Sequence, residues 1–170
     1  MVLIRRATIN DLNGVFEIYN DAVEKFAVEK TYQWVKGYPS IETFKNDLEV
    51  NNVFVVIKEN NIVGVMTVLT EDEPDYNEIE GSWLNCEKYF TVHRIAVKKE
   101  ALGMGIGSMM IEYVKKLAAD RGIYNIKIDT HKLNFDMKRL LEKRGFKLCG
   151  VIKLRNKNFD LRDAYQYCGD

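Results

Sequence analysis

The residues best placed to do chemistry lie in one stretch, from Thr91 to Ser108. An apolar β-branched run, residues 92–97, leads through a short charged turn to three alternate glycines, Gly103, Gly105 and Gly107. The run predicts a strand, and the amphipathic pattern after the glycines predicts a helix. A strand, a glycine turn and a helix N-terminus present bare main-chain N–H groups, which is how many proteins bind phosphate. The stretch therefore predicts a site for a phosphate-bearing cofactor.

The spacing of the glycines excludes the two commonest phosphate loops. The dinucleotide fingerprint Gly-x-Gly-x-x-Gly would need glycine at Ser108 or Met110, and the P-loop would need Gly-Lys-Ser/Thr, which the chain lacks. On the triplet alone, the glycines could simply end one element and begin the next. However, Gly105 to Ile111 contain no Asp or Glu, so the positive end of the predicted helix dipole is left for an outside anion.

Composition bounds the remaining possibilities. A chain of 170 residues with 46% apolar residues predicts one domain over residues 1–170 with a substantial core. The 25 basic and 25 acidic residues cancel, so we expect neither nucleic acid nor an anionic membrane as a partner. The apolar runs are strand-length, and the N-terminus lacks a secretory pattern. We therefore expect a cytoplasmic protein.

The cysteines and histidines argue against a metal site. Cys86, Cys149 and Cys168 form no Cys-x-x-Cys motif, and His93 and His131 are the only histidines. Without an export signal, reduced thiols are the default state. This set does not have the spacing of zinc ligands, so no bound metal is predicted.

Hydrophobic periodicity, caps and breakers predict the order of the elements. Strands are predicted over 2–5, 53–58, 62–69, 89–97, 124–129, 146–154 and 159–167, and helices over 12–26, 41–48, 106–120 and 134–144. Consecutive strands imply antiparallel pairs, whereas the strand–helix–strand unit over 89–129 implies a parallel pair. The sheet should therefore be mixed, in an α/β or α+β fold with helices packed on it.

Two local patterns carry expectations of their own. In strand 124–129, apolar residues alternate with Asn125, Lys127 and Asp129, which predicts a half-exposed strand. The irregular segment 70–88 carries six carboxylates between Glu71 and Glu80 and no cation there. It is either a solvated loop or an acidic lip that attracts a cationic substrate.

Two blocks of the chain resemble the GCN5-related N-acetyltransferases, the GNAT family. Leu102-Gly-Met-Gly-Ile-Gly107 resembles the family's Arg/Gln-x-x-Gly-x-Gly/Ala signature between a strand and a helix. Asn134 to Phe146 resembles its second signature, a helix that begins after Asn and ends in Gly-Phe. The spacing between the blocks fits, Arg94 to Val97 is similar to the family's core strand, and the order of elements agrees over nearly the whole chain. The chain is identified as a member of this family.

The resemblance implies a GNAT fold, with a mixed, mostly antiparallel central sheet of about seven strands flanked by helices. It implies acetyl-CoA as cofactor and direct acetyl transfer to a primary amine of a small molecule or peptide. The pyrophosphate would lie on the main-chain amides of the glycine turn, the pantetheine arm beside strand residues, and the arm's other side against Asn134 and its helix. The implied cofactor-binding residues are Ile95, Ala96, Val97, Leu102, Gly103, Met104, Gly105, Ile106, Gly107, Ser108, Asn134, Met137 and Leu141.

Two positions depart from the family pattern. Leu102 stands where Arg or Gln is usual, and the resemblance implies mostly main-chain contacts there, so binding should survive. Leu141 stands where a Tyr is common, and in many members that Tyr protonates the departing thiolate. Because leucine cannot donate a proton, the general acid is either another residue or not needed. A non-catalytic acyl-CoA-binding module on the same fold is the alternative.

The reaction needs a base, since an alkylamine is protonated at neutral pH. His93 is the leading candidate, because it lies on the predicted core strand and its reference pKa suits neutral pH; a structural His in a sheet is the other interpretation. Tyr165 or Tyr167 could supply a proton if either faces the cleft. His131, in a predicted loop, is a weaker candidate.

The acceptor has no recognisable motif. Tyr32, Trp34 and Tyr38, in the irregular segment after the first helix, could line an acceptor pocket or only pack the loop. Homodimers are common among proteins of this family, but no residue decides the oligomeric state.

Overall fold

The computed structural model describes residues 1–50, 52–155 and 160–169. They fall into two compact units: the first is Met1–Val68 with His93–Tyr113, and the second is Leu69–Val92 with Val114–Asp170. Strand β5 (Tyr89–Val97) and helix α3 (Ile106–Ala119) contribute residues to both. The expectation of one domain over residues 1–170 stays a prediction.

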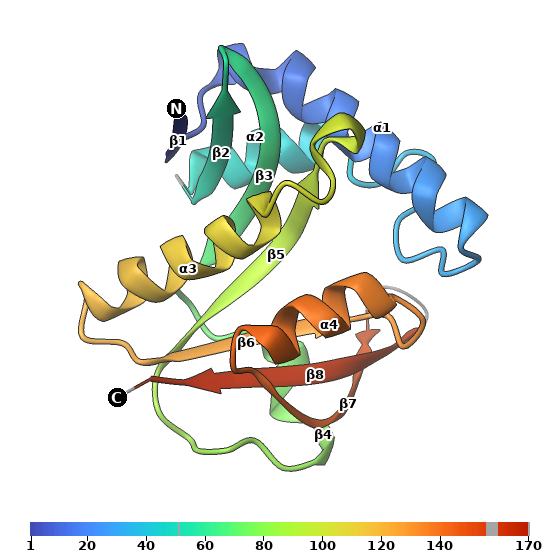
Figure 1. Cartoon of the computed structure of the whole chain (residues 1–170). Coiled ribbons are helices and arrows are strands. Elements are labelled where there is room, and N and C mark those ends of the chain that lie inside the picture. The colour runs from blue at the N-terminus through green and yellow to red at the C-terminus, as the bar shows by residue number, and fades with distance from the viewer. Residues whose placement is uncertain (51, 156–159, 170) are drawn as a thin grey trace. The chain divides into compact units, whose positions relative to one another are not determined.

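The described residues confirm the mixed α/β fold, with a mostly antiparallel sheet of eight strands in the order β1-β2-β3-β5-β6-β8-β7-β4 (Figure 1). The pair β5–β6 is parallel, and the pairs β1–β2, β2–β3, β4–β7, β6–β8 and β7–β8 are antiparallel. The other strands are β1 (Val2–Arg6), β2 (Val53–Lys58), β3 (Asn61–Leu69), β4 (Ile79–Gly81), β6 (Asn125–Thr130), β7 (Lys147–Leu154) and β8 (Asp160–Cys168). The other helices are α1 (Leu12–Val28), α2 (Ile41–Glu49) and α4 (Phe135–Lys143).

The predicted elements agree with this order, with one addition. Strand β4 has only three residues and was not predicted, because three residues are too few for an alternating pattern to be recognised. The strand predicted over 159–167 is β8, and its predicted first residue, Phe159, lies outside the described residues.

In the first unit, alternate residues of the strands pack against helices on opposite faces of the sheet. Val53, Val55 and Val65 cluster with buried residues of α1 and α2, among them Tyr19 and Phe44. On the neighbouring strand positions, Phe54 contacts Tyr113 of α3, with ring centroids 5.3 Å apart, and a Cβ added at Gly64 would lie 3.0 Å from Ile106 of that helix. This close approach fixes the start of α3 against β3.

In the second unit, β8 likewise alternates between two layers. Tyr165 and Tyr167 face α3 and α4, where the Tyr167 ring packs 5.6 Å from that of Phe146. Ala164 instead joins a buried cluster with Tyr76 and Tyr89. The irregular segment 70–88 supplies Tyr76 and Trp83 to this second layer, so it covers the sheet rather than only extending into solvent.

The half-exposed prediction for β6 is therefore wrong for Asn125 and Lys127, which are 6% and 5% exposed. The Lys127 ammonium lies 4.3 Å from the ring centroid of Trp83 and 3.9 Å from that of Tyr89, and burial lowers its pKa. Aromatic faces attract a cation, which offsets part of the cost of burying it. Alternation along β6 identifies its two faces but does not indicate what covers them.

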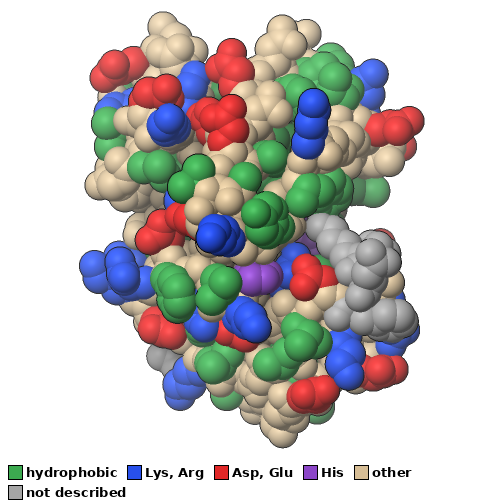
Figure 2. Space-filling view, turned by 90° about the vertical axis from the view of Figure 1, so that its right-hand side faces the viewer, with side chains coloured by type: hydrophobic (Ala, Val, Ile, Leu, Met, Phe, Trp, Pro, Cys, Tyr) green, Lys and Arg blue, Asp and Glu red, His purple; other side chains and the backbone are tan. Residues whose placement is uncertain are grey.

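The acidic residues of segment 70–88 find cations elsewhere in the second unit. Arg155 pairs with Glu78 at 2.8 Å and lies 3.9 Å from Asp75, and Lys153 pairs with Glu80 at 3.2 Å. Figure 2 shows charges of both signs interspersed on the face in view, with no extended patch of one sign. The segment therefore gives little support to a separate acidic lip.

No described helix has the length and apolar character needed to cross a membrane. Within residues 1–50, 52–155 and 160–169, no three His, Cys, Asp or Glu side chains gather where they could hold a metal ion.

Candidate functional site

The glycine turn before α3 has a left-handed backbone at two positions. Gly103 has φ 77° and Gly105 has φ 78°, a region that residues with a Cβ adopt at a cost. A Cβ added at either glycine would meet nothing within 4 Å, so backbone conformation and not crowding explains the residue type. Residues 102–105 are exposed.

The same turn holds several main-chain donors that the chain itself does not use. In the described part of the chain, the amides of Gly103 and of residues 105–108 donate to no main-chain carbonyl. The first turn of α3 contains no acidic residue. Successive amides in a turn with left-handed residues form a concave anion site, and the helix dipole adds positive charge. The turn therefore has the geometry of a phosphate-binding loop.

Lys58, at the end of β2, adds a cation to this turn. Its ammonium lies 3.4 Å from the sulfur of Met104, the residue between the two left-handed glycines. Among the described residues, Lys58 forms no ion pair with a carboxylate. Sequence reasoning missed this residue because nothing local relates a strand end at 58 to a turn at 104.

Strand β5 carries the predicted base and the residues that should hold the cofactor arm. His93, Ile95 and Val97 are half-buried and Ala96 is 9% exposed. Within the first unit, β5 is joined to β3, and the Lys98 amide just beyond the strand donates to the Val63 carbonyl at 2.9 Å. Within the second unit, β5 pairs with β6 from Tyr89 to Thr91.

Arg94 interrupts the regular alternation of β5. Its φ is 48°, in the left-handed region, although it lies in the middle of the strand. In a regular strand, residues two apart lie on one face, and His93 was expected on the same face as Ile95 for that reason. A left-handed residue between them breaks that rule, so the parity argument does not extend across Arg94.

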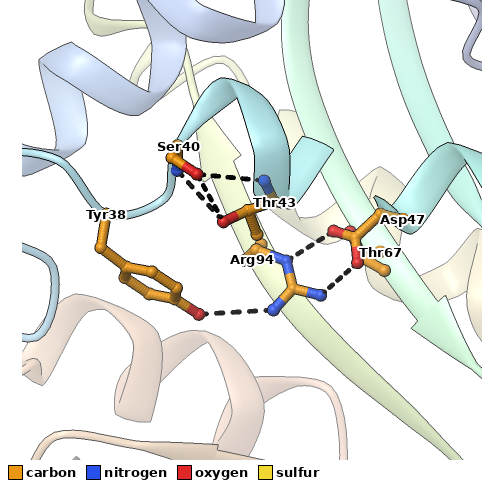
Figure 3. A network of polar contacts seen from close by, with 6 residues as sticks. All are labelled: Tyr38, Ser40, Thr43, Asp47, Thr67 and Arg94. Atoms are coloured by element: carbon orange, nitrogen blue, oxygen red, sulfur yellow. Dashed lines mark hydrogen bonds and ion pairs between the residues drawn. The ribbon is translucent and has the colours of Figure 1, made fainter. Parts of the chain in front are cut away.

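The Arg94 side chain is the centre of a polar network in the first unit (Figure 3). Its Nε and Nη2 donate to the two carboxylate oxygens of Asp47 on α2, each at 2.7 Å, and its Nη1 donates to the Tyr38 hydroxyl at 3.4 Å. The Thr67 hydroxyl donates to Asp47 at 3.1 Å. Burial lowers the pKa of Arg94 and the Asp47 contacts raise it; the net direction is upward, so the guanidinium stays charged.

The second unit holds the other predicted site residues. Asn134 is buried and caps α4, where its side-chain oxygen accepts from the Met137 amide at 3.2 Å. Met137 is half-buried, and Leu141 is fully buried. The Tyr165 hydroxyl donates to Glu142 at 3.3 Å. Asn134 therefore begins this helix as predicted.

The family model for the acetyltransferase (GNAT) family matches residues 13–146. The chain belongs to the GNAT acetyltransferase family. A search of curated proteins found no match.

Solved GNAT acetyltransferases share the fold over almost the whole chain. A GNAT-family acetyltransferase from Streptococcus agalactiae is 26% identical, with a TM-score of 0.86, and the match covers 99% of this chain and 96% of that one. A ribosomal-protein-alanine N-acetyltransferase from Brucella melitensis is 23% identical, with a TM-score of 0.71 and coverage of 98% and 99%. The PaiA N-acetyltransferase from Thermoplasma acidophilum, solved in complex with coenzyme A, is 14% identical, with a TM-score of 0.71 and coverage of 99% of each chain.

Structure gives physical content to the two departures from the GNAT pattern. Leu102 is 49% exposed at the start of the glycine turn, where it donates no side-chain hydrogen bond to an anion. Leu141 is 0% exposed and belongs to the interior of the second unit. Because leucine has no acidic proton, Leu141 cannot replace the proton donor that many GNAT members have at that position.

The burial of Tyr165 argues against its predicted role as proton donor, and Tyr165→Phe tests that role. Tyr165 is 0% exposed, and burial together with Glu142 raises its pKa to about 12, which makes it a weak acid. We expect kcat to stay within about threefold of the wild-type value, whereas a true general acid would cost about 10²-fold or more. Steady-state kinetics at saturating substrate decide between the two, with Tyr167→Phe on the same strand as the matched control.

Three residues of the site were not found from sequence. Asp47 is the buried partner of Arg94, Thr67 is buried and donates to Asp47, and Lys58 lies at the glycine turn. For Asp47 a signal existed: a carboxylate three residues after Phe44, within the apolar stripe of α2, is unfavourable unless a cation pairs with it. Of the aromatic candidates, Trp34 is 6% exposed and packs edge-on against Tyr19, so it packs the loop.

Proposed function

We propose that this GNAT protein is an acetyl-CoA-dependent N-acetyltransferase that moves an acetyl group directly to a primary amine of a small molecule or peptide. The observation that carries the proposal is the glycine turn: five unused amides, two left-handed glycines and an acid-free helix start. These groups fit a diphosphate, because each amide can donate to a charged oxygen.

Different residues would bind different parts of acetyl-CoA. Gly103 and residues 105–108 would hold the pyrophosphate, and Ile95–Val97 would hold the pantetheine arm along the β5 edge away from β3. Asn134, Met137 and Leu141 were predicted to contact the arm. Because Asn134 and Leu141 are buried, we expect their part to be mainly to shape α4. Bound acetyl-CoA supplies a thioester whose carbonyl carbon accepts the amine.

The chemistry asks two things of this chain. The ammonium of the acceptor must lose a proton before it can attack, and His93 is the proposed base, directly or through a water. The carbonyl oxygen gains charge as the amine adds, and a main-chain N–H of β5 can stabilise it. Because a thiol has a pKa near 8.5, a thiolate leaving from bound acetyl-CoA would need no obligatory acid from this chain.

A coenzyme A release assay over a broad panel of amines tests the function. Release above the rate of thioester hydrolysis, with the acetyl group found on nitrogen by mass spectrometry, is the expected result. Leu141 favours the second candidate, a non-catalytic acyl-CoA-binding module. Saturable acetyl-CoA binding with no release over any amine would support that candidate.

A thermal-shift measurement separates the two CoA-based functions from a protein that has no CoA site. Acetyl-CoA at 100 times its Kd should stabilise the folded protein by about 2.7 kcal/mol. An unchanged melting temperature at millimolar acetyl-CoA would dismiss both the enzyme and the binding module.

Lys58→Gln should weaken acetyl-CoA binding by about 5- to 10-fold, because an exposed cation beside a phosphate contributes about 1 kcal/mol. Calorimetry at two salt concentrations is the measurement, since the effect should shrink as salt screens the charge. Lys98→Gln is the matched control: it removes the same charge from the same unit, but its ammonium is held by Glu17 at 2.9 Å. Equal losses in both variants would show a general effect of charge instead.

A further inference from the structure

Arg94 holds a backbone conformation that needs an explanation. A non-glycine residue in the left-handed region is uncommon, and in mid-strand it persists only where its surroundings hold it there. With φ 48°, Arg94 lies directly after the proposed base, His93, and directly before Ile95–Val97, the residues proposed to hold the cofactor arm.

The side chain of Arg94 is held firmly by its neighbours. Two parallel hydrogen bonds of 2.7 Å to Asp47 fix both the position and the plane of the guanidinium. The two side chains are only 12% and 11% exposed, so water competes little with the pair. Thr67 on β3 orients the Asp47 carboxylate from a second element, with its hydroxyl 3.1 Å away (Figure 3).

The N-terminus of α2, the helix that carries Asp47, is capped as well. Ser40 caps this helix, accepting from the Thr43 amide at 3.0 Å, and the Tyr38 hydroxyl accepts from Arg94 just before it (Figure 3). Arg94 therefore donates directly to Asp47 of α2 and to Tyr38 of the loop that precedes α2, and Thr67 of β3 holds Asp47 in turn. Among the described residues of β5, Arg94 is the one with a left-handed backbone.

We propose that the Arg94–Asp47 pair is a positioning element for acetyl transfer. By holding residue 94 left-handed, it sets the direction of the His93 imidazole relative to the amides of residues 95–97. The proposal rests on the function proposed above. Arg94 and Asp47 are positioning residues, because they act through β5 and not on the reacting atoms.

Direct recognition of an ionic acceptor by this pair is the competing interpretation, and the charges argue against it. The Asp47 carboxylate already accepts three hydrogen bonds, two from Arg94 and one from Thr67. The charge of Arg94 is balanced by Asp47 at close range, which leaves little net charge to attract an ion. The pair is built to be rigid rather than to bind.

Comparing Arg94→Gly with Arg94→Ala isolates the backbone effect. Both variants lose the ion pair, but glycine adopts φ 48° without strain and alanine does not. We expect kcat to fall about 100-fold in Arg94→Ala and about 10-fold or less in Arg94→Gly, because small misplacements at a reacting centre cost about that much. Asp47→Asn should lower kcat about 10-fold, and Thr67→Val should lower it about twofold.

The Kd for acetyl-CoA should change less than kcat in all four variants, because the glycine turn proposed to hold the pyrophosphate is untouched and only the arm residues 95–97 shift. A loss of stability alone would not produce this pattern when rates are measured well below each melting temperature. Equal kcat values for Arg94→Ala and Arg94→Gly, or wild-type kcat in both, would overturn the proposal. If Arg94→Ala does not fold, Arg94→Lys and Thr67→Val carry the test. We expect Arg94→Lys to keep less than half of the wild-type kcat.

NMR of the free protein tests the positioning role separately from the proposed acetyltransferase function. In the free protein, the His93 ring and the amides of residues 95–97 should shift in Arg94→Ala and return toward wild-type positions in Arg94→Gly. The amides of the glycine turn should not move in either variant. A wild-type protein that transfers no acetyl group would remove the proposed function, whereas unchanged His93 and 95–97 signals in Arg94→Ala would remove the positioning role.

Discussion

Replacing Gly105 with alanine is expected to weaken acetyl-CoA binding by about 10- to 100-fold, the cost of losing one charge-assisted hydrogen bond. Alanine resists φ 78°, so the turn would relax and the amides of residues 105–108 would no longer converge. The free space around the position means that no clash contributes. Calorimetric titration with acetyl-CoA measures the effect.

Gly122→Ala is the matched control for backbone strain. Gly122 has φ 71°, and its added Cβ would also meet nothing within 4 Å, but it follows the opposite end of α3. Both variants should lose about 1–2 kcal/mol of stability, and only Gly105→Ala should lose affinity. Equal affinity in the two variants would mean that the glycine turn does not hold the cofactor.

His93→Gln is expected to lower kcat by about 10²- to 10⁴-fold, the usual contribution of a general base. Glutamine keeps a polar side chain of similar reach but does not titrate. The rise of kcat with pH that a titrating base produces should therefore disappear. Acetyl-CoA affinity should stay within about twofold, because His93 lies outside the glycine turn.

His131→Gln provides the comparison for this prediction. His131 is the other histidine, it is half-buried in the second unit, and burial lowers its pKa. Its replacement should leave both kcat and the pH profile nearly unchanged. Wild-type kinetics in His93→Gln would assign His93 to the structural role that the sequence left open.

Local sequence was sufficient for the elements and for the glycine turn. The hairpin of β2 and β3, the helix start at Asn134 and the glycine turn at 103–107 follow from patterns a few residues long. Such patterns are read correctly because each depends on side chains that interact with their own neighbouring backbone.

Helical periodicity places the edges of an apolar face less well than its centre. Ile41 and Met109 lie on the apolar stripes of α2 and α3 but are 44% and 38% exposed, whereas Ile111 and Ala118 are buried. An apolar stripe has a width, and the residues at its margins are assigned by the helix that packs opposite. Periodicity therefore determines the centre of the stripe but not its borders.

By itself, the sequence determined the family, the order of the elements and the glycine turn, because each depends on residues close together in the chain. The tertiary structure alone decided the left-handed Arg94 and its pairing with Asp47, 47 residues away, and the placing of Lys58 beside Met104, 46 residues away. It also decided the burial of Lys127 under Trp83 and Tyr89. The physical reason is common to all three: a charge is placed by its partner, and the partner is chosen by the fold.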